Sequence, residues 1–407
     1  MQLGPDDYSP ALVRSITRHG GKDPFDEASV DLRTDLGIEI TAKQVQRITE
    51  RIGREWTAQR DREADLCKLG HLPRLYSDAP EVAVTMCDGG RLQIRESDTK
   101  PGVHDPQWRE PKYGCCLTMD THESRRDPHP EPPEAYLNHT RVAKLVREVQ
   151  SSGAAAVERR TKELKKRPKA PAGHRRAPRD SRYLVRTTIA TMRSSNRFGE
   201  LLATEAYRRG FDLAQRKGFV ADGEGYNWTI WLNEFQRWGF VPILDFLHLL
   251  TYVYPAAHAA GGPHWRRCRR YDKWLRWAWT GERQKLLSAL RAASNRAGNP
   301  PRSAAESDHR RVLAAAHTYV RNNLDKMDYP RYRKLGLPVS SAPIESQVKQ
   351  FNKRMKGTEK FWTEDGAESV LQVRGAYLSQ DGRAERHWAL PRPLYRAVGR
   401  NRLALVN

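Results

Sequence analysis

Long apolar runs and paired cysteines are both missing from this sequence. No stretch of the 407 residues approaches the roughly eighteen consecutive apolar residues of a membrane-spanning helix, so we expect no membrane contact. The first residues lack the charged and apolar regions of a signal peptide. None of the five cysteines forms a CxxC pair, which argues against a disulfide framework and a cysteine-rich zinc site. We therefore expect a reduced, cytoplasmic protein.

Basic residues, in contrast, are abundant. The formal net charge is +22 and the isoelectric point is near 10. Such a surplus favours a polyanionic partner, because each phosphate neutralised by Lys or Arg releases condensed counterions. The alternative is a basic protein that is merely soluble, although solubility needs a smaller excess. Apolar residues make up 38% of the chain, which is enough for two or three domains with real cores.

Residues 1–75 are predicted to be helical and to contain a helix-turn-helix. A first helix ends at Gly37, Thr41 begins a second with Gln44 as its capping-box partner, and Gly53 is expected to end it. Paired helices with a basic face are also common in proteins that do not read DNA, so DNA reading is one of two interpretations. The candidate DNA-binding side chains on the second helix are Lys43, Gln44, Arg47 and Arg51.

The middle of the chain predicts a mixed α/β core. The first three of five β-rich runs are expected to form an antiparallel meander. A helix over 198–217 precedes the fourth run, and Pro242 confines the fifth to a sheet edge. This order is that of a ribonuclease H-like core, in which the first and fourth strands lie side by side. The five runs are 81–87, 91–95, 114–119, 218–221 and 240–246.

A basic linker interrupts this predicted core at about 151–182. Between residues 159 and 182 it carries eleven basic and two acidic residues, so it either contacts phosphates or is simply solvated. The expected organisation has an N-terminal helical domain, a core that contains the linker, a helical insertion, the rest of the core and a tail. These segments are 1–75, 76–258, 259–335, 336–388 and 389–407.

Three carboxylates are candidates for metal-dependent chemistry. Asp88 follows the first predicted strand and Asp222 the fourth, so both are expected at one end of the sheet, and Glu345 would arrive there on a late helix. Carboxylate oxygens are the ligands that magnesium prefers, and two such ions can activate an attacking oxygen and stabilise a leaving one. Each Asp precedes a glycine, so the alternative is that both simply form turns.

The helix that carries Glu345 is predicted to begin near Pro343, capped by Ser340 or Ser341, and to end at Gly357. Its buried stripe is Ile344, Val348, Phe351 and Met355. Its neighbouring face carries Glu345 and the DNA-binding candidates Lys349, Lys353 and Lys356. Such a face suits a helix that lines a DNA channel. The alternative is a solvated ion pair between Glu345 and Lys349.

Asp245 and His248 form an Asp-x-x-His pair after the edge strand. A histidine at such a position is more often structural than a ligand. It can also position a phosphate or a water molecule, because its charge changes near neutral pH.

With these residues in place, the chain resembles bacterial insertion-sequence transposases of the DDE type, in particular the Kra-type insertion-sequence family. The resemblance runs from about residue 10 to Trp388, and its most specific block lies between residues 319 and 349. The matching segments are Asp88-Gly89-Gly90, Val220-Ala221-Asp222-Gly223, Trp228-Thr229-Ile230-Trp231, Asp245-Phe246-Leu247-His248, Tyr319-Val320-Arg321-Asn322-Asn323, Met327-Asp328-Tyr329-Pro330, Tyr332-Arg333, Gly336-Leu337-Pro338, Ile344-Glu345-Ser346, Lys349, Trp362, Gly366-Ala367 and Leu371-Gln372-Val373-Arg374.

The resemblance implies a ribonuclease H-like fold with a helical insertion, and a transposase that cleaves element ends and transfers the freed 3′ hydroxyl. It assigns metal binding, by two Mg²⁺ or Mn²⁺ ions, to Asp88, Asp222 and Glu345, and the family's Asp/Cys-x-x-His feature to Asp245 and His248. The implied partners are double-stranded DNA of the element ends and the target, and further copies of the chain, because two ends must be joined. The implied location is the nucleoid of a bacterial cytoplasm.

One departure from the family pattern concerns the turn before Glu345, where Ser340-Ser341-Ala342 stands in place of Gly-Ser-Gly. If that turn needs a positive φ angle, Ala342 would strain it. Two further hypotheses therefore stay open. One is a non-catalytic DNA-binding descendant of a transposase, and the other is a nuclease on the same ribonuclease H-like fold.

Overall fold

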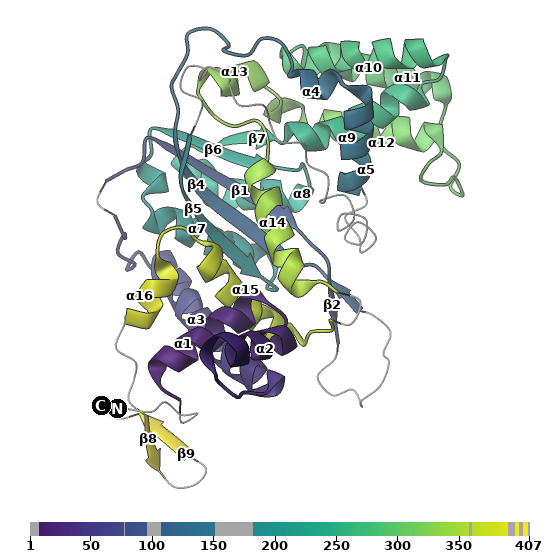
Figure 1. Ribbon diagram of the computed structural model, residues 1–407. Coiled ribbons are helices and arrows are strands. Elements are labelled where there is room, and N and C mark those ends of the chain that lie inside the picture. The colour runs from purple at the N-terminus through teal and green to yellow at the C-terminus, as the bar shows by residue number, and fades with distance from the viewer. Residues whose placement is uncertain are drawn as a thin grey trace, which may run out of the picture.

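A mixed five-stranded sheet lies at the centre of the computed structural model (Figure 1). The structure describes residues 8–76, 78–95, 107–150, 182–357 and 360–389, and two short strands near the C-terminus. The sheet has the order β5-β4-β1-β6-β7, with β4 antiparallel to both β1 and β5, and with β6 and β7 parallel to β1. The strands are β1 (Val82–Gly89), β4 (Lys112–Asp120), β5 (Arg182–Thr191), β6 (Arg216–Ala221) and β7 (Val241–Leu244).

Two sequence predictions about this sheet are confirmed. The first and fourth predicted strands, β1 and β6, are neighbours, with Val82 opposite Arg216 and Met86 opposite Val220. The strand that contains Pro242 is an edge strand, as expected for a residue without a backbone donor.

The predicted antiparallel meander contains the wrong strands. The run at 91–95 forms β2 (Leu92–Ile94), which pairs with β3 (Gln107–Arg109) in a separate two-stranded sheet. β1 pairs directly with β4, and the third antiparallel strand is β5. The sequence analysis missed β5 because it directly follows the basic stretch and contains three threonines, so its pattern is polar. The linker residues 151–181 lie outside the described part of the chain.

Alternate side chains of β1 pack on the two faces of the sheet. Val82, Val84 and Met86 face one core, which they share with α9 (Phe246–Ala259) and α14 (Ala342–Met355). Ala83 and Cys87 face a second core beside α7 (Ser195–Arg208). Because side chains alternate along a strand, Asp88 belongs to the same face as Met86 and therefore to the side covered by α14.

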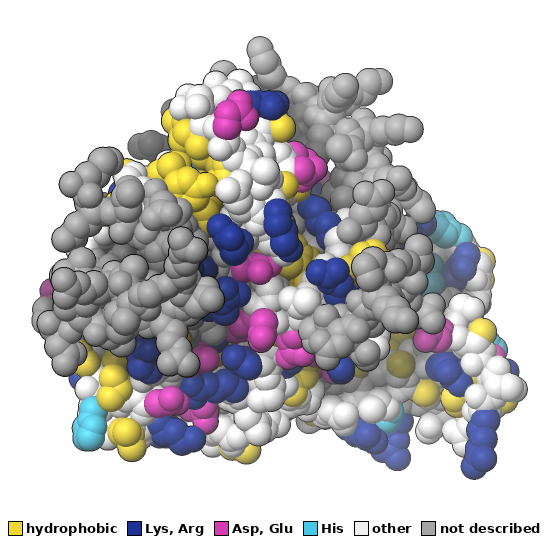
Figure 2. All heavy atoms as spheres, turned by 90° about the horizontal axis from the view of Figure 1, so that it is seen from below, with side chains coloured by type: hydrophobic (Ala, Val, Ile, Leu, Met, Phe, Trp, Pro, Cys, Tyr) yellow, Lys and Arg dark blue, Asp and Glu magenta, His cyan; other side chains and the backbone are white. Residues whose placement is uncertain are grey.

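The N-terminal helices form a third core together with the end of the described chain. The predicted capping box is confirmed, since Thr41 and Gln44 exchange hydrogen bonds at the start of α3, and Gly37 ends α2 in the left-handed region. The core also contains Val373 and Ala384. The helices are α1 (Pro10–Lys22), α2 (Phe25–Leu36), α3 (Ala42–Lys68), α15 (Glu364–Leu378) and α16 (Arg383–Ala389). Seen from below, the underside of the molecule, where these helices lie, mixes acidic and basic side chains (Figure 2).

Gly53 does not end the second helix, contrary to the prediction, because α3 continues to Lys68. A Cβ atom at Gly53 would lie 2.4 Å from the carbonyl oxygen of Ser369 in α15. This glycine therefore serves the close approach of two helices rather than a turn.

A helical lobe projects from the β7 side of the sheet (Figure 1). It contains the predicted insertion, joined by three earlier helices, and Trp274 and Trp279 are buried in it. Its helices are α4 (Glu134–Leu137), α5 (His139–Gln150), α9, α10 (His264–Trp279), α11 (Arg283–Ala297), α12 (His309–Asn323), the short η4 (Leu324–Lys326) and α13 (Tyr329–Lys334).

The remaining elements are short. They are η1 (Phe211–Leu213), α8 (Gly225–Ile230) with its continuations η2 (Trp231–Phe235) and η3 (Gln236–Trp238), and the hairpin of β8 (Tyr395–Val398) and β9 (Arg402–Leu405). Across the described residues, no helix combines the length and the apolar character that a membrane crossing requires.

Candidate active site

Three aspartates lie at the same end of three adjacent parallel strands. Met86 of β1 is opposite Val220 of β6, so Asp88 and Asp222 each follow that pair by two residues. Ala221 of β6 is opposite Leu244 of β7, and Asp222 and Asp245 each follow that pair by one. The backbone N–H of Asp245 donates to Ala221 at 2.8 Å, which keeps the strand ends in register. The sequence analysis expected Asp88 and Asp222 here, and the structure adds Asp245.

The carboxylate of Asp222 is held by the start of α8. Its Oδ1 accepts hydrogen bonds from the backbone N–H of Glu224 at 3.0 Å and from the side-chain amide of Asn227 at 2.7 Å. Asn227 is fully buried and accepts a hydrogen bond from Cys87 at 3.1 Å. These contacts fix one oxygen of Asp222, so the orientation of the carboxylate is set before any ligand arrives.

The backbone at Asp222 is fixed from α12. The hydroxyl of Tyr319 donates to the carbonyl oxygen of Asp222 at 2.5 Å, and its ring stacks on Tyr252 at 3.8 Å between centroids. The next residue, Gly223, has a φ of +95°, and a Cβ atom there would lie 2.9 Å from the Tyr319 ring. Glycine is therefore required at this position both by conformation and by space.

Asp88 is poorly solvated and lies close to like charge. Its Oδ1 accepts a hydrogen bond from the backbone N–H of Gly89 at 2.8 Å. Burial, and after it the negative charge of Asp222, raises the pKa of Asp88 to about 7. Holding this carboxylate ionised therefore costs free energy in the protein alone, and a bound cation would remove that cost.

Asp245 is fully buried and accepts five hydrogen bonds. As the N-cap of α9 it accepts from the backbone N–H groups of Leu247 and His248, at 3.1 and 3.3 Å. The backbone N–H and hydroxyl of Ser341, 96 residues later, donate to it at 3.1 and 2.7 Å, and Nδ1 of His248 donates at 2.7 Å. Although burial opposes it, His248 and Ser341 together hold the pKa of Asp245 below its ordinary value.

His248 is a cation at neutral pH in this arrangement. Burial by itself lowers its pKa, but the hydrogen bond and charge of Asp245, assisted by the charges of Asp222 and Asp88, raise it to about 10. A protonated imidazole has no lone pair for a metal ion. Among the described residues, its Nε2 has no hydrogen-bond partner, so that N–H is left for an external acceptor.

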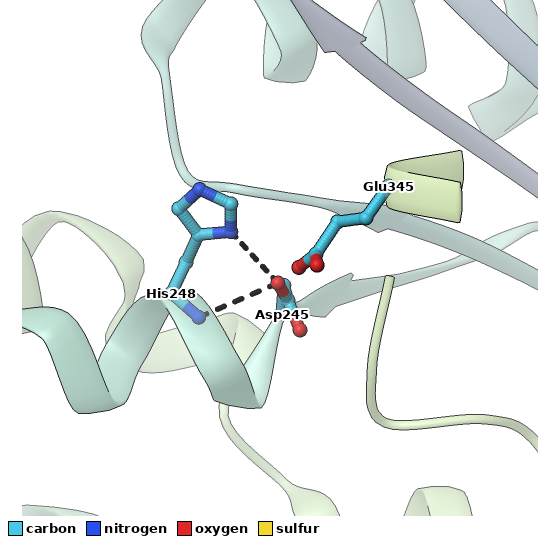
Figure 3. A group of neighbouring side chains, drawn as sticks. All are labelled: Asp245, His248 and Glu345. Carbon is cyan, nitrogen blue, oxygen red and sulfur yellow. Dashed lines mark hydrogen bonds and ion pairs between the residues drawn. The ribbon is translucent and has the colours of Figure 1, made fainter. Parts of the chain in front are cut away.

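Glu345 reaches into the same site from the first turn of α14 (Figure 3). Its ligand atoms lie within 4.8 Å of those of Asp245 and His248. Oε2 is 3.8 Å from the ammonium group of Lys349, whereas Oε1 is buried without a hydrogen-bond partner in the described part of the chain. Burial and the charge of Asp245 raise the pKa of Glu345.

The metal ligands predicted from the sequence are Asp88, Asp222 and Glu345, whereas the ligand atoms that lie within 4.8 Å of one another belong to Asp245, His248 and Glu345. In the absence of a metal ion, Asp245 accepts five hydrogen bonds and its charge raises the pKa of His248. Within the described residues, the predicted triad does not form a group with all ligand atoms within 4.8 Å. The unpartnered Oε1 of Glu345 and the raised pKa of Asp88 both indicate room for positive charge.

The structure also locates the turn before Glu345. Ser341 is the N-cap residue, but its hydroxyl bonds Asp245 instead of capping the helix, and Ser340 accepts from the backbone N–H of Ala342 at 3.2 Å. Ala342 is the first residue of α14 and has helical backbone angles. The strain considered for Ala342 is therefore absent. The predicted buried stripe of this helix is confirmed at Ile344, Val348, Phe351 and Met355.

The candidate DNA-binding residues are placed as follows. On α14, Lys349 and Lys353 are exposed, and Lys356 is half-buried with its pKa lowered by burial and by Arg91. On α3, Lys43 and Arg47 are exposed. Gln44 is engaged in the capping box and with Tyr8, and Arg51 forms an ion pair with Glu55 at 2.7 Å.

Asn227, Tyr319 and Ser341 were not identified as site residues from the sequence. Each contacts an aspartate that is distant along the chain or on another element, so no local pattern marks it. Comparison with known proteins found no family model that matches the chain and no similar curated protein.

Proposed function

We propose that this protein is a DNA transposase of the DDE type, which cleaves the ends of an insertion sequence and joins them to target DNA. The observation that carries the proposal is the position of Asp88 and Asp222 at the same end of two adjacent parallel strands, with Glu345 on a helix over the same sheet face. The strand order, with the first and fourth core strands paired, supports a ribonuclease H-like core. The resemblance to the Kra-type insertion-sequence family supports the same assignment.

Divalent Mg²⁺ or Mn²⁺ would be held by Asp88, Asp222 and Glu345. When bound, such ions polarise a phosphoryl group and lower the pKa of a coordinated water or hydroxyl. The chain contributes orientation, because Asn227 fixes Asp222 and Ser341 fixes the start of the Glu345 helix. Oxygen donors in a partly dry site suit hard cations of this kind.

His248 supplies positive charge that does not depend on a metal. Its imidazolium is anchored through Nδ1 to Asp245 at 2.7 Å, which leaves the Nε2–H for a phosphate oxygen. A charge-assisted hydrogen bond from a fixed donor is a suitable contact for the scissile or neighbouring phosphate. This role agrees with the positioning of a phosphate, one of the interpretations that the Asp-x-x-His pair left open.

The test is metal-dependent cleavage of DNA that contains the flanks of the gene. Wild type is compared with three isosteric variants, Asp88→Asn, Asp222→Asn and Glu345→Gln. Asp120→Asn is the matched control, because Asp120 ends β4 at the opposite end of the sheet and is exposed. We expect Mn²⁺-dependent cleavage by wild type and by the control, and its loss in the three site variants with DNA binding retained.

Other outcomes separate the rival hypotheses. Salt-sensitive DNA binding by wild type without cleavage in Mn²⁺ would favour a non-catalytic descendant. Products that are cut and never joined would favour a nuclease. Cleavage retained in one site variant would remove that residue from the metal site.

A further inference from the structure

The helical lobe carries a large share of the positive charge of the chain. Residues 259–335 contain eighteen Lys and Arg against six Asp and Glu, so this segment has a net charge of +12 out of +22 for the whole chain. Residues 1–75, which include the predicted helix-turn-helix, contain twelve basic and thirteen acidic residues, a net charge of −1. A surface that attracts phosphate by charge is therefore expected on the lobe.

Within the lobe, α10 presents a basic face to solvent. Arg266, Arg269 and Lys273 are exposed and recur at three and four residues, which places them on one side of the helix. At 1.5 Å per residue, the row spans about 10 Å, the length of about three base-pair steps. The opposite side of α10 is buried in the core through Tyr271 and Trp274.

Few acidic groups compete for this row. Among the described residues, Arg266, Arg269 and Lys273 have no carboxylate within ion-pair distance, whereas Arg276, one turn further, pairs with Glu131. The guanidinium group of Arg266 lies over the ring of Trp265, 5.0 Å from its centroid. The ammonium group of Lys273 lies 4.8 Å from the centroid of the Trp277 ring. The aromatic contacts steady these long side chains without neutralising their charge.

The N-terminal helices mix both signs of charge. Arg14, Arg18 and Lys22 form an exposed basic row on α1, but the hollow beside α2 that Lys22 lines is also lined by Asp23, Asp26, Glu27 and Asp31. These charges repel phosphate next to Lys43 and Arg47 of α3, and the underside in Figure 2 shows the resulting mixture of signs. Charge alone therefore favours the lobe over the predicted helix-turn-helix as the main phosphate contact.

We propose that the exposed face of α10 is the main phosphate-binding surface outside the active site and that its partner is double-stranded DNA. The identity of the partner as DNA rests on the proposed function, whereas the phosphate-binding surface itself does not. A row of point charges along a helix contacts the regular backbone of a duplex without reading bases. The lobe is joined to the candidate active site by α9, whose fourteen residues follow the Asp245 cap and extend about 21 Å.

The experiment measures DNA binding in EDTA, so that it does not depend on catalysis. Fluorescence anisotropy with a labelled duplex of about 30 base pairs gives the dissociation constant as a function of salt concentration. Glutamine replaces three residues at once, which removes charge and keeps helix propensity. The α10 variant is Arg266→Gln/Arg269→Gln/Lys273→Gln, and the matched α3 variant is Lys43→Gln/Arg47→Gln/Arg54→Gln.

We expect the α10 variant to bind about tenfold more weakly or worse, with a salt slope reduced by about 2 to 3, since each lost phosphate contact removes about 0.9. The α3 variant is expected to keep the wild-type slope. An unchanged slope in the α10 variant, an equal loss in the α3 variant, or tighter binding of duplex RNA than of DNA would overturn the inference.

Equal melting temperatures of the three proteins establish that the variants are folded. Absence of cleavage in the presence of Mn²⁺ would count against the proposed function and would leave this binding result intact. Conversely, equal salt slopes for wild type and the α10 variant would count against the α10 surface and would leave a result of metal-dependent cleavage unaffected.

Discussion

The buried pair of Asp245 and His248 makes the stability of the protein depend on pH above neutrality. In the folded protein the pKa of His248 is raised from 6.5 to about 10, chiefly by Asp245 against the opposing effect of burial. A histidine with a raised pKa contributes stability that is fully present below pH 6.5 and is lost as the pH rises toward 10. The variant Asp245→Asn removes the partner charge and therefore this dependence.

The magnitude follows from linkage. Between the unfolded and folded pKa values, each pH unit changes the free energy of unfolding by about 1.4 kcal/mol. From pH 7 to pH 9, wild type should lose about 3 kcal/mol relative to Asp245→Asn, in which the pKa of His248 falls to 6.5 or below. The whole contribution is on the order of 3–5 kcal/mol, the range found when one partner of a buried ion pair is removed.

The assay is urea unfolding of wild type and Asp245→Asn at several pH values between 6.5 and 9. The variant should be the less stable protein at pH 6.5, and the difference should shrink as the pH rises. Ser341→Ala is the matched control, because it removes one hydrogen bond to Asp245 and leaves the ion pair. It should cost about 1 kcal/mol at every pH.

A constant difference between wild type and Asp245→Asn across this range would refute the reasoning, because it would mean that His248 does not bind an extra proton on folding. His248→Gln provides a second check. With no titrating side chain, the stability difference between His248→Gln and the double variant Asp245→Asn/His248→Gln should be independent of pH.

Two further predictions concern repulsion and packing. Asp88→Asn removes a charge beside Asp222, so without metal this variant should melt at a higher temperature than wild type. Because the raised pKa of Asp88 destabilises the fold increasingly as the pH rises from 3.8 toward 7, the gain in melting temperature should be full above pH 7 and absent below pH 4. A variant that melts below wild type at pH 8 would contradict this prediction. Gly53→Ala should destabilise the protein by about 1–3 kcal/mol in urea unfolding, because its Cβ would meet Ser369, whereas Gly225→Ala, with nothing within 4 Å, should be neutral; equal effects would remove the packing argument.

What could be predicted from the sequence depended on local rules. The capping box of Thr41 and Gln44, the left-handed Gly37 and the edge strand with Pro242 each follow from short-range chemistry, and all three are confirmed. The prediction that Gly53 ends the helix was wrong because glycine occurs both in turns and at close helix contacts. Only the position of α15 decides between the two. β5 was not predicted because it directly follows the basic stretch and its three threonines make its pattern polar.

The residues of the candidate site also divide into those that local sequence predicts and those that it does not. Asp88 and Asp222 lie at the ends of buried strands, so their position at one end of the sheet could be expected once the strands were placed, and the register of β1 and β6 agrees with it. Their roles as metal ligands stay predictions. The hydrogen bonds from Ser341 to Asp245 could not be expected, because they join residues 96 positions apart that carry no common pattern.

Asp245 links the two surfaces that the proposed function needs. Through its N-cap bonds it begins α9, the helix that leads into the basic lobe, and through Ser341 it fixes the residue that precedes the Glu345 helix. A change in the direction of α9 would therefore disturb the three hydrogen bonds that Leu247 and His248 donate to Asp245. If duplex DNA bound to α10 shifts the lobe, we expect the first turn of α14 to be the first part of the candidate active site to respond. Glu345 lies in that turn, four residues after Ser341, which donates hydrogen bonds to Asp245. Protection of the α14 amides from hydrogen exchange should then increase when DNA binds in EDTA, and the triple α10 variant should abolish that increase.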